Sequence, residues 1–387
     1  MDFELTDDQR LLQKSVRELA ERLIVPHAHD WDEEERFPHE VVKPMGEMGL
    51  FGMQVPEKFG GAGMKFHDYV IALEEIARAD ASVGLTMASH NSLCTGHILL
   101  AGSEAQKQRY LPRLAGGEVL GGWGLTEPGS GSDAGAARTR AVRQGDTGKW
   151  VVNGTKTFIT QGSVGGVFVV MASTSPEKKA KGLTAFVIER GMPGFRTGKK
   201  IHKMGLRASD TTELIFEDVT VGDEQRLGEI DNGFFDTLKV LDKGRIGIGA
   251  WSVGIGRAAF EASRRYAKER VQFGKSLGEF QAIQHMLADM ATELDAARLL
   301  VWRAAWMQDQ GQRTTEESSI AKYYAARATV RACNAAVQIH GGYGYTREFA
   351  VERYLRDAKL AEIGEGTNEV QKMVIARELL RTAAEQG

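Results

Sequence analysis

Residues 121–135 read GGWGLTEPGSGSDAG, and the pattern of the chain changes at this stretch. Before it, apolar residues recur every three or four positions, which is the period of an α-helix. After it, short runs of β-branched and aromatic residues alternate with turns, which is typical of β-strands. The helical period returns after about Gly228. The sequence therefore predicts a helical part, a β part and a second helical part, in that order.

The length of the chain supports this division. Its 387 residues exceed the roughly 250–300 residues at which a single hydrophobic core stops growing. We therefore predict an α+β multidomain protein, with an all-α domain at 1–118, a β domain at 119–228 and a helical bundle at 229–387.

Individual helices of the first domain can be placed. The first helix follows a cap at Thr6, and its apolar positions are Leu11, Leu12, Val16, Leu19 and Leu23. Small residues at 81–96 indicate tightly packed helices. Further helices are predicted at 38–48, 69–79 and 104–114.

The β domain contains several strand-like runs and one strong turn signal. Asn153-Gly154 favours a hairpin with a type I′ turn, because both residue types tolerate a positive φ. An exposed loop is expected at 175–179. Strands are predicted at 150–152, 156–160, 167–172, 184–188 and 213–216.

Two features distinguish the C-terminal domain. The stretch 244–256 carries five glycines, each about 1 kcal/mol less favourable in a helix than alanine, which predicts the close approach of another helix or of a ligand. The second feature is a long apolar stripe formed by Ile283, Met286, Leu287, Met290, Leu294, Ala297, Leu300 and Val301.

Charge and composition exclude several classes of function. Lys and Arg number 49 against 52 Asp and Glu, so no global field attracts nucleic acid. Cys94 and Cys333 lack metal-ligand spacing, and we expect neither a metal site nor a disulfide. No apolar run approaches the ~20 residues of a membrane span, and the acidic start at 1–5 is unlike a secretory or transit peptide. We expect a cytoplasmic protein without membrane contact.

Four segments are candidate sites, each with a structural alternative. The loop 125–135 offers backbone N–H groups and hydroxyls to a phosphate, or is a simple Gly/Ser connection. In 362–371, Glu365 between two glycines is a general base, or Thr367 is a helix cap and Glu365 is solvated. The Gly-rich break at 338–345 lines a ligand or only stops a helix, and Asp242 and Arg245 can form a simple ion pair.

Taken together and in this order, these segments resemble the acyl-CoA dehydrogenase family from Leu5 to Leu380, and the nearest resemblance is to short-chain, or butyryl-CoA, dehydrogenases. The resemblance implies an N-terminal helical domain, a middle β-barrel domain and a C-terminal four-helix bundle, with FAD between them. It also implies a homo-oligomer, expected to be a tetramer. The segments that carry it are 125–132, 152–160, 203–219, 241–248, 270–274, 338–342 and 365–371.

The resemblance also assigns residues to the cofactor and the substrate. Arg270 and Gln281 would reach the FAD of a neighbouring subunit, and Thr126 and Thr160 would donate hydrogen bonds to the flavin ring. The residues implied for FAD are Trp123, Leu125, Thr126, Ser132, Phe158, Ile159, Thr160, Arg270, Phe273, Gln281, Gln338, Ile339, Gly341, Gly342, Thr367, Asn368 and Glu369. Those implied for acyl-CoA are Ser132, Asp242, Lys243, Gly244, Arg245, Gly364 and Gly366.

The reaction implied is the α,β-dehydrogenation of a short-chain acyl-CoA to the trans-2-enoyl-CoA. Glu365 would take the α-proton, and electrons would pass to electron-transferring flavoprotein. Some relatives that act on branched or long chains carry the base at the position of Gly244, which leaves Glu365 as the matching carboxylate. Backbone N–H of Glu365 would bind the thioester oxygen.

Three departures bear on the substrate. Gly364 stands where short- and medium-chain relatives usually have Tyr, and isovaleryl-type relatives also have Gly, so a branched-chain or medium-chain substrate is an alternative. Phe158 replaces a frequent Trp. The segment 81–91 has no Arg to pair with a dicarboxylic substrate. Two further alternatives are a flavin oxidase and a non-catalytic flavoprotein that binds nucleic acid.

Overall fold

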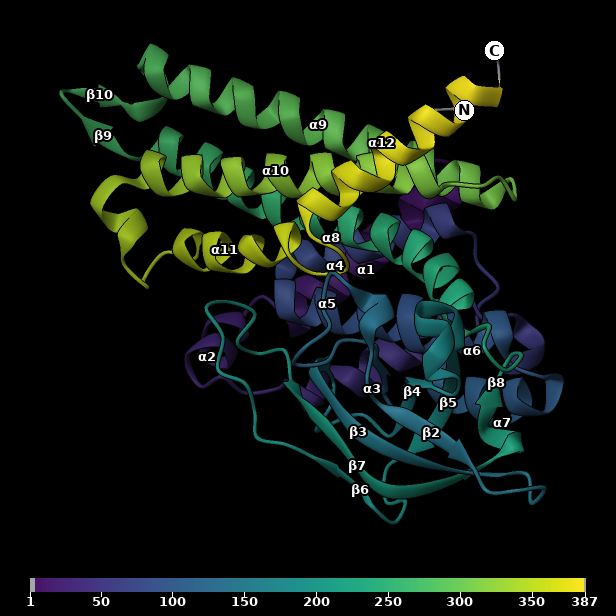
Figure 1. The fold of residues 1–387 in the computed structure, drawn as a ribbon. Helices are drawn as coiled ribbons and strands as arrows, with labels where there is room; N and C mark the ends of the chain where they lie inside the picture. The colour runs from purple at the N-terminus through teal and green to yellow at the C-terminus, as the bar shows by residue number, and fades with distance from the viewer. Residues whose placement is uncertain (1–3, 386–387) are drawn as a thin grey trace.

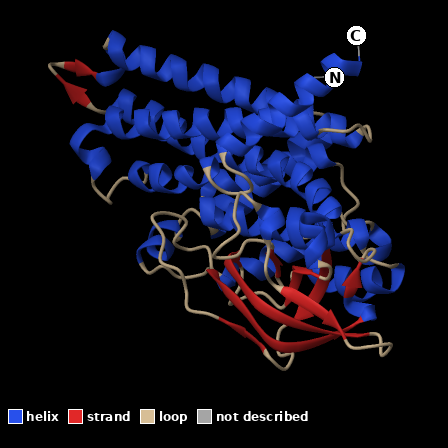
Figure 2. Ribbon diagram, in the orientation of Figure 1, coloured by secondary structure: helices blue, strands red, loops and turns tan. Residues whose placement is uncertain are grey.

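The computed structural model describes residues 4–385, and its helices and strands are segregated (Figures 1 and 2). Long C-terminal helices form one layer, N-terminal helices lie in the middle, and a mixed sheet lies on the far side. The predicted order of a helical, a β and a second helical part is confirmed. Among residues 4–385, no helix combines the length and the apolar character that crossing a bilayer requires.

The N-terminal helices begin where the sequence places them. Thr6 caps the first helix, because its hydroxyl accepts the backbone N–H of Gln9 and the Gln9 side chain reaches back to the Thr6 N–H. Leu11 was wrongly assigned to the apolar face, since its side chain is 63% exposed. The elements are α1 (Asp7–Leu23), α2 (Ala28–Glu33), α3 (His39–Glu47), α4 (Phe66–Ala79), α5 (Ala81–Ala88), a π-helical segment (Ser89–Thr95), α6 (Gly96–Ala101) and α7 (Glu104–Ala115).

The middle domain is an eight-stranded sheet in the order β6-β7-β3-β2-β4-β5-β8, with β1 paired to β4. One face of β4 points Phe168 and Val170 into a core between the strands, and the other points Val169 and Met171 at the N-terminal helices. The strands are β1 (Gly121–Gly124), β2 (Arg140–Arg143), β3 (Lys149–Thr160), β4 (Val167–Ser173), β5 (Leu183–Glu189), β6 (Phe195–Thr197), β7 (Thr211–Gly222) and β8 (Arg226–Leu227).

The hairpin predicted at Asn153-Gly154 is wrong, because β3 runs unbroken through both residues and pairs along its length with β7. The register shifts between Val152 and Gly154, where Glu217 and Asp218 of β7 lie opposite Asn153 alone, so the bulge is in β7. Asn153 bonds Asp218 across the strands, and a Cβ on Gly154 would lie 2.6 Å from Oγ1 of Thr139. The glycine permits a close approach inside a strand.

The C-terminal domain is built on α8, whose glycines let neighbouring helices approach. Side chains at Gly249 and Gly256 would press on Val301 and Leu294 of α9, and one at Gly254 would press on α4, so the predicted close approach is confirmed. Met290, Leu294, Ala297 and Val301 of the predicted stripe are buried. The elements are α8 (Gly233–Glu269), β9 (Val271–Gln272), β10 (Lys275–Ser276), α9 (Gln281–Asp309), α10 (Thr315–His340), α11 (Val351–Ala358) and α12 (Asn368–Glu385).

The close contact between Gly154 and Thr139 gives a test of the fold. Gly154→Ala should lower the apparent melting temperature, because the new methyl group meets Thr139 and the residue keeps a φ of +146°. We expect a loss of about 1–3 kcal/mol in the free energy of unfolding. Gly145→Ala is the matched control, since Gly145 also has a positive φ but nothing within 4 Å of its would-be Cβ. Equal losses in thermal unfolding would contradict the steric account.

Candidate active site

Glu365 lies in a tight turn between a short 3₁₀ segment (Lys359–Glu362) and α12. Its φ is +51°, and that of Gly366 is +93°. Two successive left-handed residues are unusual, and the first costs roughly 1–2 kcal/mol because the Cβ of Glu365 comes too close to the following carbonyl oxygen. Surrounding groups must therefore hold the turn in place.

The carboxylate of Glu365 packs against the bare backbone of Gly244 in α8. A Cβ at Gly244 would overlap Oε2 of Glu365 and would touch Leu93 at 3.3 Å. Oε2 is buried and has no hydrogen-bond partner. The structure thus brings Glu365 and Gly244, which are 121 positions apart in the sequence, to one point.

Burial decides the protonation of this carboxyl group. Loss of water raises the pKa of Glu365 to about 7, against the smaller opposing attraction of Lys322 and Arg245. Burial and the neighbouring Glu365 carboxylate also raise the pKa of Tyr69, whose hydroxyl is buried without a partner. The alternative in which Glu365 is solvated is wrong.

The other half of that alternative holds, because Thr367 Oγ1 accepts the N–H of Val370 in the first turn of α12. Thr367 is therefore a cap, and Glu365 is half-buried as a residue but has a fully buried Oε2. Asn368 is buried and its Oδ1 has no partner, whereas Glu369 is exposed.

Asp242 and Arg245 form the ion pair that their spacing predicts, with Nη1 of Arg245 2.9 Å from Oδ1 of Asp242. Thr315 donates to the other carboxylate oxygen at 2.6 Å. Arg245 is almost fully buried, and its Nε has no acceptor. Desolvation lowers the pKa of Lys243 beside them. This turn of α8 therefore presents positive charge next to Gly244.

A second group of predicted residues lies on the β domain. Phe158 has a φ of +57° at a register shift in β3, and its ring is 65% exposed. The backbone of Thr157 bonds that of Thr126 at 2.9 Å, which ties the loop after β1 to the same bulge. An outward aromatic ring beside this loop suits a flat aromatic cofactor.

Not all residues assigned to this surface can offer a side chain. The side chain of Ile159 packs inside the core between the strands, and Leu125 and Trp123 are also buried. Trp123 donates to Nδ1 of His97 at 3.2 Å. Ser132 is exposed, and Thr160 is half-buried. Contacts of Ile159 with a cofactor would have to come from its backbone.

A third group lies far from Glu365, at the end of α8 and α10 beside the hairpin of β9 and β10 (Figure 1). The Arg270 guanidinium lies 5.3 Å from the ring centre of Tyr343, and Phe273 is 93% exposed. Gln338 is 16 positions beyond Lys322 along α10, which is roughly 24 Å. The members are Arg270, Phe273, Gln281, Gln338, Ile339, Gly341 and Gly342. Within one chain, this third group of residues therefore does not lie near Glu365.

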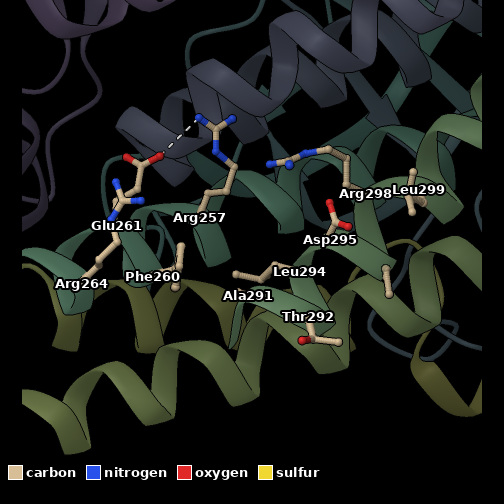
Figure 3. A pocket seen from close by; sticks show the side chains of 11 residues that line it. Arg257, Phe260, Glu261, Arg264, Ala291, Thr292, Leu294, Asp295, Arg298 and Leu299 are labelled. Carbon is tan, nitrogen blue, oxygen red and sulfur yellow. Dashed lines mark hydrogen bonds and ion pairs between the residues drawn. The ribbon is translucent and has the colours of Figure 1, made fainter. Parts of the chain in front are cut away.

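A groove of about 710 Å³ lies between α8 and α9 and is lined by ion pairs (Figure 3). Arg257 of this groove pairs with Glu74 and Glu75 of α4 and with Glu261, and Arg298 pairs with Glu74 at 2.7 Å. These charges hold α4, α8 and α9 together. The catalytic candidates lie elsewhere.

Three groups around Glu365 were not predicted from the sequence: Tyr69, Lys322 and Gln371. Lys322 carried a usable signal, because it stands on the stripe of small buried residues of α10, where a charged residue needs a partner. No pattern pointed to Tyr69 or Gln371.

The chain matches models of acyl-CoA dehydrogenase domains: the N-terminal domain over residues 6–118, the middle domain over 122–219 and the C-terminal domain over 231–380. It is 47% identical over 381 residues to the short-chain specific acyl-CoA dehydrogenase of Clostridium acetobutylicum, covering 98% of this chain and 100% of that one. The chain belongs to the acyl-CoA dehydrogenase family. It is an FAD-dependent oxidoreductase.

Two solved structures agree with this membership. Butyryl-CoA dehydrogenase from Megasphaera elsdenii is 42% identical, with a TM-score of 0.96 over 98% of this chain and 100% of that chain. A chain in the structure reported for the electron transferring flavoprotein of Acidaminococcus fermentans is 44% identical, with a TM-score of 0.96 over the same shares. The predicted resemblance to the acyl-CoA dehydrogenase family is confirmed, as are the three-domain fold, the enzyme class and the FAD cofactor.

The buried carboxylate makes a prediction about stability. The pKa of Glu365 is raised in the fold, so stability falls as the pH rises from about 4.5 to about 7. Glu365→Gln should therefore melt at a higher temperature than the parent at pH 8, with a gain of up to about 3 kcal/mol in the free energy of unfolding, and this gain should vanish near pH 4.5.

Thermal unfolding of the holoenzyme against pH measures this effect. Glu369→Gln is the control, because Glu369 lies in the same segment but is exposed, and its pKa is lowered by hydrogen bonds with its own backbone and Thr367. It should show no gain at pH 8. A Glu365→Gln variant without a pH-dependent gain would contradict the burial of the charge.

Proposed function

We propose that this enzyme oxidises a short-chain acyl-CoA to the trans-2-enoyl-CoA, with Glu365 as the base that takes the α-proton. One observation carries the proposal: Oε2 of Glu365 is buried, lacks a hydrogen-bond partner and lies at the glycine where a second helix exposes its backbone. FAD, when bound, supplies the acceptor for the hydride that leaves the β-carbon.

The carboxylate is suited to abstract a weakly acidic proton. Its pKa of about 7 lets it exist ionised near neutral pH while remaining a stronger base than a solvated Glu. No group within hydrogen-bonding distance shields Oε2. Rigid placement matters as much as basicity, and the turn at 364–366 supplies it.

The turn also offers a donor to the thioester oxygen. Among the hydrogen bonds of residues 4–385, none uses the backbone N–H of Glu365. A free N–H beside the base would stabilise the negative charge that develops on that oxygen. We assign Asp242–Arg245, Ser132, Gly364 and Gly366 to the surroundings of the acyl-CoA, because Gly244 and Arg245 flank the Glu365 carboxylate.

The residues implied for FAD lie in two separate places on one chain, and this separation bears on the assembly of the enzyme. Roughly 24 Å of α10 separates Gln338 from Lys322, so we propose that Arg270, Phe273, Gln281 and the segment 338–342 serve the FAD of a neighbouring subunit in a homotetramer. The 93% exposure of Phe273 fits a side chain that is covered on assembly. We further propose electron-transferring flavoprotein as the acceptor and domain boundaries near residues 118 and 228.

The role of Glu365 is tested by removing its charge. Glu365→Gln should retain yellow FAD but lose about 10²–10⁴-fold in kcat for butyryl-CoA, because the amide cannot accept the proton. Dye-coupled turnover measures the loss, and the visible flavin spectrum checks cofactor binding. The parent kcat/KM should fall below about pH 7 with the protonation of Glu365. Activity of the variant comparable with that of the parent would exclude this base.

The acyl group is set in part by Gly364. A Cβ there would meet only Leu360, at an ordinary 3.5 Å, so the backbone tolerates a larger residue. The missing side chain leaves room for a branch, and isovaleryl-CoA is therefore a second candidate substrate beside butyryl-CoA.

Gly364→Tyr tests that room. The ring should lower kcat/KM for isovaleryl-CoA at least about tenfold more than for butyryl-CoA, since a filled pocket discriminates by one carbon branch. Steady-state rates of the parent and the variant with butyryl-, isovaleryl- and octanoyl-CoA give the ratios. Equal effects on the straight and branched substrates would count against a wall at residue 364.

A further inference from the structure

Lys322 lies fully buried in the middle of α10 and points at the turn that carries Glu365. Its Nζ donates to the carbonyl oxygen of Gly366 at 2.8 Å. Nε2 of Gln371 donates to the same oxygen at 2.9 Å, and to the carbonyl of Glu365 at 3.3 Å. Two donors from two helices therefore grip the peptide that follows the base.

This grip falls on the strained part of the chain. Glu365 and Gly366 have φ values of +51° and +93°, and a left-handed Glu persists only where its surroundings over-determine it. The hydrogen bonds to the Gly366 carbonyl supply that constraint from α10 and from α12. A change in the orientation of this peptide would move the carboxylate away from Gly244.

Burying an ammonium group costs desolvation free energy, and a single hydrogen bond to a carbonyl does not require a charge. An uncharged donor such as Gln371 makes the same bond without the cost of burying a charge. The ammonium is of further use only if a nearby negative charge compensates it. Burial lowers the pKa of Lys322 to about 8, so the ammonium is still largely protonated near pH 7. Glu365 is the compensating charge, since it opposes that shift more than Glu362 or Glu369 does.

We propose that Lys322 is a positioning residue for the base: its ammonium group clamps the Gly366 carbonyl, fixes the left-handed turn and balances the Glu365 carboxylate across it. This role rests on the proposed function of Glu365. It differs from that of Gln371, which shares the clamp but carries no charge.

The charges around the pair come from three helices. Glu365 faces Lys322 from α10, Arg245 from α8 and the hydroxyl of Tyr69 from α4. Lys322 in turn faces Arg245, which opposes its charge. Among the described residues 4–385, Lys322 and Arg245 are the cations that favour ionised Glu365, so loss of the Lys322 cation lets the carboxyl group hold its proton to a higher pH.

The test compares the pH dependence of kcat/KM in holoenzyme variants, with butyryl-CoA between pH 5.5 and 9. At low pH, kcat/KM falls as the base of the free enzyme is protonated, and we call this fall the acidic limb. Lys322→Met should move the midpoint of the acidic limb to a pH higher by about one unit or more. Lys322→Arg keeps the charge, so its acidic limb should lie close to that of the parent. Gln371→Leu should lower kcat/KM at every pH but leave the midpoint of the acidic limb unchanged.

Lys203→Met is the matched control. Lys203 is a half-buried lysine that donates to a backbone carbonyl, that of Ser209 at 2.9 Å, and Glu365 is absent from the charges that act on it. Its loss should lower the melting temperature but leave the acidic limb where the parent has it. A Lys322→Met limb that coincides with the parent limb would overturn the proposal.

A folding failure is also informative. If Lys322→Met does not retain FAD, the double variant Lys322→Met/Glu365→Gln should regain it, because the second substitution removes the carboxylate whose counter-charge the first one took away. Failure of both variants would mean a purely structural lysine and would overturn the proposal. Glu365→Gln alone tests the proposed function: an active Glu365→Gln variant refutes the base itself, whereas an inactive one with an unmoved Lys322→Met limb refutes only the role of Lys322.

Discussion

The Glu365 carboxylate rests against a backbone that has no side chain, and the rest of the site follows from that contact. Gly244 is required because any Cβ there would occupy the position of Oε2. The left-handed turn is required because it directs the side chain from the start of α12 toward α8. Burial then raises the pKa of Glu365 to about 7, and Lys322 and Arg245 limit how far it rises.

The scaffold keeps this arrangement rigid with two kinds of contact. Glycines along α8 let α4 and α9 pack closely on it. The carboxylates of Glu74 and Glu75, buried in α4, are paired with Arg257, which ties α4 to α8. Breaking a buried pair of this kind leaves an uncompensated charge, so the helices that carry Gly244 and Tyr69 are held in register. Stability is concentrated away from the base, where a carboxylate whose buried Oε2 has no hydrogen bond costs stability at neutral pH.

Sequence patterns predicted the order of the domains and many helix boundaries, because the helical period and caps such as Thr6 are local. They failed where distant segments decide. Asn153-Gly154 has the local chemistry of a hairpin turn, yet pairing with β7 keeps both residues inside a continuous strand, opposite a bulge in β7. Leu11 follows the helical period but faces solvent.

The site shows the same division. The flanking glycines of Glu365 were visible in the sequence, but a solvated carboxylate was the favoured interpretation until the resemblance to a family was considered. Burial of Oε2, its contact with Gly244 and the roles of Tyr69, Lys322 and Gln371 depend on the packing of α4, α8, α10 and α12. No spacing within one segment encodes such contacts.

The most direct measurement is the titration of the Glu365 carboxyl group itself. Carbon-13 NMR of the holoenzyme labelled at the Glu carboxyl carbons, with the Glu365→Gln spectrum used to assign the signal, gives the midpoint without turnover. The account predicts a midpoint near pH 7. A midpoint near 4.5, the value of a solvated Glu, would contradict it.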